Sequence, residues 1–277
     1  MRMGIVQMAV GADVEDNLAR AAQGVREACR QGAELVALPE IFCCPYASEA
    51  FPRYAEPAGG HIWSALAAMA RESGAWLVGG SMPELDGGRV YNTSFVFDPQ
   101  GRQVARHRKV HLFDVDVKGG QHFQESATLT AGDDVTTFET PWGTVGLAIC
   151  FDIRFPELFR LMNARGARLV IVPAAFNPTT GPLHWELLFR GRAVDGQMFA
   201  VGVAPACDEG AGYVSYAHSI ACDPWGHVLL DAGTQPSVRV VDLDLPACDE
   251  VRAQLPLLSA RRTDLYGILD RATGNTW

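Results

Sequence analysis

Cys150, Glu40 and Lys109 are the residues whose types would together support nucleophilic catalysis. Cys150 ends an apolar run and is followed at once by charged residues, which is typical of a strand that turns into a helix. Unpaired N–H groups at the start of a helix stabilise a thiolate, so this position favours a reactive cysteine. Free cysteines are also among the most buried residue types and are usually inert. Position alone therefore supports reactivity and packing about equally.

Glu40 and Lys109 would supply the acid-base group and the cation that a cysteine nucleophile needs. Glu40 ends a short apolar segment, and Lys109 directly follows a predicted strand over residues 103–108. Side chains at the ends of strands in an α/β fold converge where ligands bind. We therefore expect Cys150 as nucleophile, Glu40 as general base and then acid, and Lys109 as a fixed cation beside a developing oxyanion. Glu125 is a candidate second carboxylate that orients the lysine or helps the proton transfers.

Each of these residues also has an ordinary structural explanation. Glu40 alone would be a solvated strand end, and Lys109 alone would belong to an exposed basic face over residues 106–109. A papain-like cysteine–histidine dyad is disfavoured because the local signature of that class is absent around the cysteine. His107 and His111 would suit a metal only if they shared a helix, whereas this region is predicted as strand and then loop, so we expect no metal site.

The segments that must position these residues alternate between apolar strands and amphipathic helices, which is typical of a layered α/β fold. Strands are expected over residues 4–10, 34–40, 75–80, 91–97, 103–108, 135–140, 144–149, 167–174, 199–204, 218–222, 227–230 and 238–243. Helices are expected over residues 13–30, 62–72 and 183–194, and after Cys150 with Asp152 as a candidate N-cap. Turn sequences such as Asp98–Gly101 predict hairpins, so the sheets are expected to be mixed. The segment from Val110 to Gly132 is predicted as a long functional loop.

Length, charge and cysteine content narrow the class of protein. The chain has 277 residues, 48% of them hydrophobic, and no repeat or linker divides it, so we expect one domain over residues 1–277. The formal charge of −9 argues against nucleic-acid binding. No apolar stretch approaches the length of a membrane span and no secretory signal is recognised, so we expect a cytoplasmic protein with no membrane partner. Seven cysteines without paired metal-type spacing disfavour a disulfide framework or structural zinc.

Four separated motifs resemble those of the nitrilase superfamily of carbon-nitrogen hydrolases. These motifs are Leu38–Phe42, Arg108–Asp114, Ile149–Glu157 and Pro173–Trp185. Within the superfamily the chain looks most like the omega-amidase branch, at His111–Asp116, Phe123–Ser126, Phe176–Pro182 and Arg261–Tyr266. One such motif would be a weak signal, but several in order across nearly the whole chain, with the matching residue at each centre, are a specific one.

The resemblance implies a four-layer α-β-β-α sandwich with mixed sheets, a homodimer, and a cofactor-free reaction through a cysteine thioester. Glu40 would take the thiol proton as Cys150 attacks the amide carbon, and the oxyanion would be held by Lys109 and the backbone N–H of Phe151. Ammonia would leave with a proton from Glu40, and water would then hydrolyse the acyl-enzyme. The family commonly has tyrosine where this chain has Phe151, but only the backbone of that residue is needed.

The substrates of this branch are ω-amides of short dicarboxylates, such as α-ketoglutaramate, α-ketosuccinamate and succinamate, whose distant carboxylate needs a cation. Arg154 follows the nucleophile by four residues and is suited to bind it, unless it pairs with Glu157 on a helix surface. Phe176, Thr180 and Tyr46 would wall the pocket or hydrogen-bond the substrate, although Phe176 also suits core packing. The alternatives are a deaminated glutathione amidase, an N-carbamoyl amidohydrolase, a nitrilase, or a catalytically silent interaction protein, which would be expected to have a broken triad.

Overall fold

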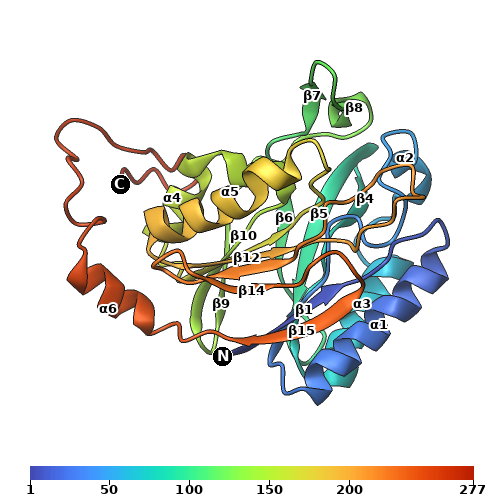
Figure 1. Cartoon of the computed structure of the whole chain (residues 1–277), viewed down its shortest axis with the longest axis horizontal. Helices are drawn as coiled ribbons and strands as arrows, with labels where there is room; N and C mark the ends of the chain where they lie inside the picture. The colour runs from blue at the N-terminus through green and yellow to red at the C-terminus, as the bar shows by residue number, and fades with distance from the viewer.

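Two β-sheets pack face to face in the computed structural model, which describes residues 1–277, and helices cover their outer faces. Figure 1 shows the four layers, which run from α4 and α5 through the two sheets to α1 and α3. The helices are α1 (Val14–Arg30), α2 (Phe51–Tyr54), α3 (His61–Ser73), α4 (Pro156–Ala164), α5 (Gly181–Gly196) and α6 (Ala247–Gln254). None of them combines the length and the apolar character that crossing a bilayer requires.

Both sheets have parallel strands at their centre and antiparallel strands at their edges. The first sheet consists of β1 (Arg2–Gln7), β2 (Leu35–Ala37), β3 (Trp76–Val78), β4 (Met82–Asp86), β5 (Arg89–Phe97), β6 (Gln103–Arg108) and β15 (Ser237–Asp242). The second consists of β9 (Thr136–Thr140), β10 (Gly143–Leu147), β11 (Leu169–Pro173), β12 (Phe199–Val203), β13 (Ile220–Cys222) and β14 (Val228–Asp231). β1, β2 and β3 run parallel, as do β10, β11 and β12. The prediction of a single α-β-β-α sandwich with mixed sheets is therefore confirmed.

Three apolar clusters fill the spaces between the four layers. One cluster packs α1 and α3 against the first sheet, a second lies between the two sheets, and a third packs α4 and α5 against the second sheet. Fully burying a large apolar side chain contributes about 1.5–3 kcal/mol relative to leaving it exposed, so these layers hold the strands rigidly. The loops at the strand ends are therefore carried on a fixed frame.

The structure adds elements that the sequence patterns did not predict. α2, β4 and α6 were not expected, and the segment predicted as a long loop contains a short hairpin of β7 (Asp114–Asp116) and β8 (His122–Gln124), followed by the 3-10 turn η1 (Glu125–Ala127). This hairpin projects beyond the sheets (Figure 1). Strands of three residues are too short for a clear alternation of apolar and polar side chains, which is why no period marks them.

Asp152 does not N-cap the helix after Cys150, so that prediction is wrong. Residues Cys150–Arg154 form a separate 3-10 turn, η2, and α4 begins only at Pro156, with Phe155 as its N-cap. Proline suits the first turn of a helix because its fixed φ is already helical and its missing N–H would have no partner there. The Asp152 carboxylate is engaged elsewhere, in contacts that reach across to another strand.

Candidate active site

Glu40, Lys109 and Glu125 meet in a buried ion-pair cluster at one edge of the sandwich. The Lys109 Nζ lies 2.9 Å from Oε1 of Glu40 and 2.9 Å from Oε1 of Glu125, and none of the three side chains is exposed. Glu40 follows β2, Lys109 follows β6, and Glu125 begins η1. The structure thus brings these three predicted residues together, with one ammonium shared between two carboxylates.

Glu40 is fixed by donors from three other segments. Nδ2 of Asn92 lies 2.9 Å from Oε1, and the hydroxyl of Tyr46 lies 3.3 Å from the same oxygen. The backbone N–H of Ala175, just beyond β11, donates to Oε2 at 2.8 Å. Ile41 has a φ of 46°, which lies in the left-handed region, so the backbone turns sharply after Glu40. A β-branched residue in that region costs about 1–3 kcal/mol, and this turn keeps the carboxylate aimed at the cluster.

Cys150 opens η2 in a strained conformation beside Glu40. Its φ of 45° lies in the left-handed region, which non-glycine residues rarely adopt, and its residue surface is only 4% exposed. The thiol lies close enough to the Glu40 carboxylate and to the backbone N–H of Ala175 for both groups to influence its pKa. The same backbone N–H therefore donates to the candidate base and lies beside the candidate nucleophile.

Asp152 anchors the turn that presents Cys150. Its Oδ2 accepts a hydrogen bond from the N–H of Ile149 at 3.0 Å and lies 3.0 Å from Nε2 of His107. Its Oδ1 accepts from the backbone N–H of His111 at 2.9 Å and lies 2.8 Å from Nδ1 of that residue. Burial alone would raise the pKa of Asp152, but the hydrogen bonds from His107 and His111 outweigh it and hold that pKa well below its ordinary value. The two histidines thus contact a carboxylate within the turn that begins at Cys150.

Burial and the ion-pair cluster determine the protonation state of the site. Burial raises the pKa of the Cys150 thiol well above its ordinary value, and the Glu40 carboxylate raises it further against the opposing charge of Lys109. Burial also raises the pKa of Glu40, although Lys109 opposes that rise. Burial opposes the charge on Lys109, but Glu125 and Glu40 outweigh it and raise the pKa of the lysine well above its usual value. The resting site therefore holds a charged lysine and a neutral thiol.

Tyr46 contacts the carboxylates of the cluster directly. Its hydroxyl lies 2.8 Å from Oε1 of Glu125, while Oε2 of Glu125 accepts from the backbone N–H of Phe113 at 2.7 Å. Burial raises the pKa of Tyr46 well above its ordinary value, so its hydroxyl stays protonated and donates. The sequence predicted Tyr46 as a substrate contact, and the structure places its ring at a cavity wall and its hydroxyl on the carboxylates.

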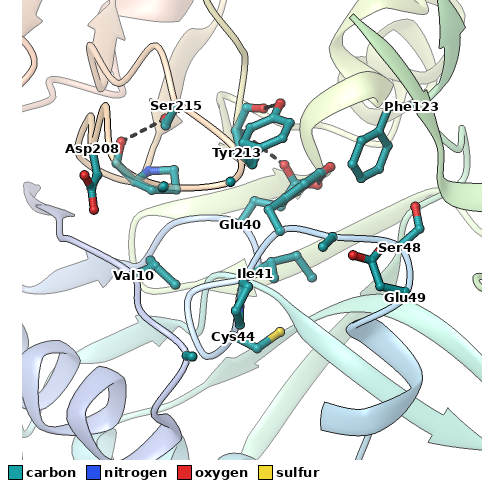
Figure 2. A pocket seen from close by; sticks show the side chains of 18 of the residues that line it. Val10, Glu40, Ile41, Cys44, Ser48, Glu49, Phe123, Asp208, Tyr213 and Ser215 are labelled. Carbon is teal, nitrogen blue, oxygen red and sulfur yellow. Dashed lines mark hydrogen bonds between the residues drawn. The ribbon is translucent and has the colours of Figure 1, made fainter.

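A cavity of about 800 Å³, which we call the main cavity, opens beside Glu40. Its inner wall includes Glu40, Tyr46, Ala175 and Tyr213, and its outer wall is built by the loop after β2, the β7–β8 hairpin and the segment around Asp208. Figure 2 shows Glu40 and Tyr213 near the centre of this wall. The cavity gives a small molecule access to the candidate base. Cys150 is not among the residues that line the cavity, but it lies close to Glu40 and Ala175, which both do.

A smaller cavity of about 270 Å³, the Arg154 cavity, adjoins the main cavity and shares Gln121 with it. Phe151, Arg154 and Thr180 all line it. Arg154 is half-buried, forms no ion pair with Glu157, and its Nη1 lies 3.1 Å from Nδ1 of His184. Burial lowers the pKa of this guanidinium, and the charge of a Cys150 thiolate would oppose that shift. Arg154 is thus a cation close to the cysteine with no carboxylate of the protein bound to it.

Phe176 and Thr180 have different positions relative to these cavities. The Phe176 ring is buried, packs edge-on against Trp185 with ring centroids 5.1 Å apart, and lies 4.9 Å from the Arg154 guanidinium. It lines neither cavity and supports the arginine from behind. Thr180 lines the Arg154 cavity, and its backbone N–H donates to Oδ1 of Asn177 at 3.1 Å. Of the two, only Thr180 has a side chain at a cavity wall.

Three residues of the site were missed by sequence reasoning. Asn92 lies within a predicted strand, where a polar residue is ordinarily taken to face solvent, and only the pairing of β5 with its neighbours shows that it faces Glu40. Asp152 was assigned to a helix cap. Tyr213 lies in a glycine-rich loop that no pattern singled out, and its ring centroid is 4.5 Å from that of Tyr46. The Gly-Ala-Gly sequence before Tyr213 was the one available sign of a close-packed functional loop.

Proteins of similar sequence match nearly the whole length of this chain. The chain is 49% identical over 267 residues to "Omega-amidase NIT2" of Mus musculus, covering 96% of this chain and 97% of the relative. It is 46% identical to the Homo sapiens protein of the same name, again over 96% and 97% of the two chains.

Solved structures agree with this likeness. The structure matches Saccharomyces cerevisiae Nit3, described as a member of branch 10 of the nitrilase superfamily, with a TM-score of 0.87, 37% identity, and coverage of 95% of this chain and 96% of that one. It also matches a mutant amidase from Nesterenkonia sp. AN1, which carries the acetamide moiety of fluoroacetamide on its active-site cysteine, with a TM-score of 0.79, 28% identity, and coverage of 96% and 95%. The family model for carbon-nitrogen hydrolases matches residues 2–253, and the chain belongs to this family of enzymes.

Proposed function

We propose that the protein is an omega-amidase, which hydrolyses the ω-amide of short dicarboxylate monoamides such as α-ketoglutaramate, α-ketosuccinamate and succinamate. The observation that carries this proposal is Arg154, a half-buried guanidinium close to Cys150 with no carboxylate partner in the protein. A buried cation left unpaired is costly, and a substrate carboxylate would supply the missing charge through two parallel hydrogen bonds. The identity of 46–49% to omega-amidases from several vertebrates supports the same substrate class.

The first half of the reaction would form a thioester on Cys150. Glu40 takes the thiol proton as the sulfur attacks the amide carbon, because its carboxylate lies beside the neutral thiol. The oxyanion develops beside the ammonium of Lys109 and the backbone N–H of Phe151, which belongs to the first turn of η2, where N–H groups lack partners within the turn. Glu40 then protonates the leaving nitrogen, and the amide C–N bond breaks.

The second half of the reaction would return the cysteine to its resting state. Glu40, deprotonated again, takes a proton from a water molecule that attacks the thioester carbon, and the thiol leaves with a proton from the same carboxyl group. Glu125 and Tyr46 position Lys109 and Glu40 through their hydrogen bonds, so we assign both to positioning. All the chemistry is supplied by side chains and water, and no cofactor takes part.

A substrate panel tests this function. The rates of product release should be highest for α-ketoglutaramate and succinamate, and low for deaminated glutathione, an N-carbamoyl amino acid and a simple nitrile. Arg154→Ala should reduce kcat/KM for succinamate by about a hundredfold or more, because the carboxylate loses a charged hydrogen-bond partner. Butyramide, which has no carboxylate, should lose much less activity, and Arg154→Lys should recover part of the loss on succinamate. Equal losses on both amides would assign Arg154 to a structural role and remove the main support for this function.

We further propose that the whole chain forms one hydrolase domain that acts as a homodimer in the cytoplasm. Arg165, the residue directly after α4, pairs with Asp270 at 2.7 Å, which ties the C-terminal segment to the hydrolase sandwich. Leu183 and Leu187 of α5 are 71% and 67% exposed on the outer layer, and apolar side chains exposed on one helix face are typical of a subunit interface. The seven free cysteines fit a reducing compartment. In sedimentation experiments the wild type should be a dimer, and the Leu187→Asp variant should dissociate into monomers more readily.

A further inference from the structure

The main cavity is far larger than an unsubstituted amide nitrogen requires. Its volume is about 800 Å³, against about 270 Å³ for the Arg154 cavity. Ammonia is about the size of a water molecule, which occupies about 30 Å³ in the liquid. The main cavity reaches Glu40, the group that would protonate the leaving nitrogen, so the space lies on the side of the substrate from which the nitrogen departs.

The charges of the two cavities differ in a way that orients a substrate. Arg154 lines the smaller cavity, whereas no lysine or arginine lines the main cavity. The ionisable side chains at the outer wall of the main cavity include the imidazole of His122 and the carboxylates of Glu49 and Asp208, which Figure 2 shows on opposite sides of Glu40. The substrate carboxylate is therefore favoured at Arg154 and disfavoured in the main cavity.

We propose that the main cavity binds a chain attached to the leaving nitrogen, so that the enzyme hydrolyses N-alkyl monoamides of short dicarboxylates and prefers neutral or cationic chains to anionic ones. Half of the residues that line this cavity are hydrophobic, including Val10, Ile41 and Phe123, which suits an alkyl chain. This inference rests on the proposed function, because it assumes that the acyl half carries its carboxylate to Arg154.

The reaction balances as an ordinary hydrolysis. The Cys150 sulfur forms a bond to the amide carbon, its proton passes to Glu40, and Glu40 delivers that proton to the nitrogen as the C–N bond breaks, releasing the alkylamine. Water then replaces the sulfur on the acyl carbon, giving the dicarboxylate and the regenerated thiol. One amide and one water thus yield one dicarboxylate and one amine, with no oxidant or reductant.

The proposal can be tested with four monoamides of succinate, by measuring the rate at which each releases succinate. They are succinamate, N-butylsuccinamate, N-(4-aminobutyl)succinamate and N-(3-carboxypropyl)succinamate. The butyl and aminobutyl compounds should keep kcat/KM within about tenfold of succinamate, and the carboxypropyl compound should fall at least about tenfold below the butyl compound. If succinamate is hydrolysed and the butyl compound is not, this inference is wrong and the proposed function survives. If succinamate itself gives no succinate, the proposed function is the part that has failed.

Gly212 offers a variant that fills the main cavity. It lines the cavity, and a Cβ added there meets no atom within 4 Å, so Gly212→Leu adds bulk at the cavity wall. This variant should lower the ratio of N-butylsuccinamate to succinamate activity by about tenfold or more. Ala19→Leu is the matched control, because Ala19 is exposed on α1 and lines no part of the cavity. An unchanged ratio in Gly212→Leu would show that the alkyl chain lies elsewhere.

Glu49→Lys tests the charge preference. Reversing this charge at the cavity wall should raise the ratio of carboxypropyl to butyl activity by about tenfold, because the anionic chain then meets a cation instead of a carboxylate. Glu250→Lys changes the net charge equally on α6, outside the cavity, and should leave that ratio unchanged. If both variants shift the ratio alike, the preference comes from overall charge and the proposed lining role of Glu49 is refuted.

Discussion

Asp152 and His111 are joined by two contacts to a single oxygen. Oδ1 of Asp152 lies 2.9 Å from the backbone nitrogen of His111 and 2.8 Å from its Nδ1. Asp152 belongs to the turn that begins at Cys150, and His111 follows Lys109 by two residues. The segment that carries the candidate nucleophile and the segment that carries the candidate oxyanion cation are therefore fastened to each other, and they cannot shift independently.

Asp152→Asn should lower stability at neutral pH by about 3 kcal/mol or more, because a buried charged partner of two histidines is lost. The pKa of Asp152 is depressed in the folded protein, so its contribution is complete above the ordinary aspartate pKa of about 3.9 and is lost as the pH falls through the folded-state value. Urea unfolding at several pH values should therefore show the difference between wild type and variant shrinking in acid. Asp116→Asn, at an exposed aspartate–histidine pair, should change stability by less than about 0.5 kcal/mol.

Cys150→Ala should abolish amide hydrolysis, with a loss of at least about a thousandfold in kcat. The change removes one sulfur from a buried position, and the circular dichroism spectrum should keep its native form. Cys207→Ala is the matched control, since Cys207 is half-buried, free, and absent from the ion-pair cluster. Mass spectrometry should detect a trapped acyl group on Cys150 in the wild type at short reaction times. Retained turnover in Cys150→Ala would exclude the thioester mechanism.

Lys109→Ala should lower kcat by about a hundredfold or more, as loss of one oxyanion donor does elsewhere. It also leaves Glu40 and Glu125 buried next to each other without a cation, which costs about 3–5 kcal/mol of stability. A paired variant, Lys109→Met with Glu125→Gln, removes one charge of each sign and should recover stability without recovering kcat. Recovery of both would mean that the lysine serves only to pair the carboxylates.

The rate should depend on pH through two raised pKa values. Hydrolysis needs Glu40 as carboxylate and Cys150 as thiol, so kcat/KM should fall in acid as Glu40 becomes protonated and fall in alkali as the thiol ionises. Burial raises both pKa values, which places the acid limb above the ordinary glutamate value of about 4.3 and the alkaline limb above about 8.5. Glu125 raises the pKa of Glu40, so Glu125→Gln should move the acid limb to lower pH. A shift to higher pH would contradict this arrangement.

The sequence predicted the layers and the strand ends well because apolar runs and turn residues are local signals. Glu40, Lys109 and Cys150 each stand next to a strand end, so their candidacy needed no knowledge of which strands pair. Asn92 and Tyr213 were out of reach for the opposite reason, since their contacts depend on the register of β5 with its neighbours and on the path of a loop. The role of Phe176 was ambiguous from the sequence. An aromatic residue that packs behind an arginine and one that lines a pocket give the same sequence pattern.

Arg154 shows a further limit of local reasoning. A spacing of four residues from the cysteine indicated proximity but left two partners open, the substrate and Glu157. The 3-10 turn decides between them geometrically: η2 ends before α4 begins, so Arg154 and Glu157 do not share a helix and form no ion pair. When one helix ends and the next begins within three residues, the spacing of apolar residues cannot show where the boundary lies.

The N–H of Ala175 has a consequence for how sequences of this enzyme can be interpreted. It donates to Oε2 of Glu40 at 2.8 Å and lies beside the Cys150 sulfur, yet it belongs to the main chain. Replacing the side chain of residue 175 cannot delete this N–H, so alanine scanning would not reveal that the position of Glu40 depends on it. Only proline, which has no N–H, or an amide-to-ester replacement made by chemical synthesis would expose that dependence.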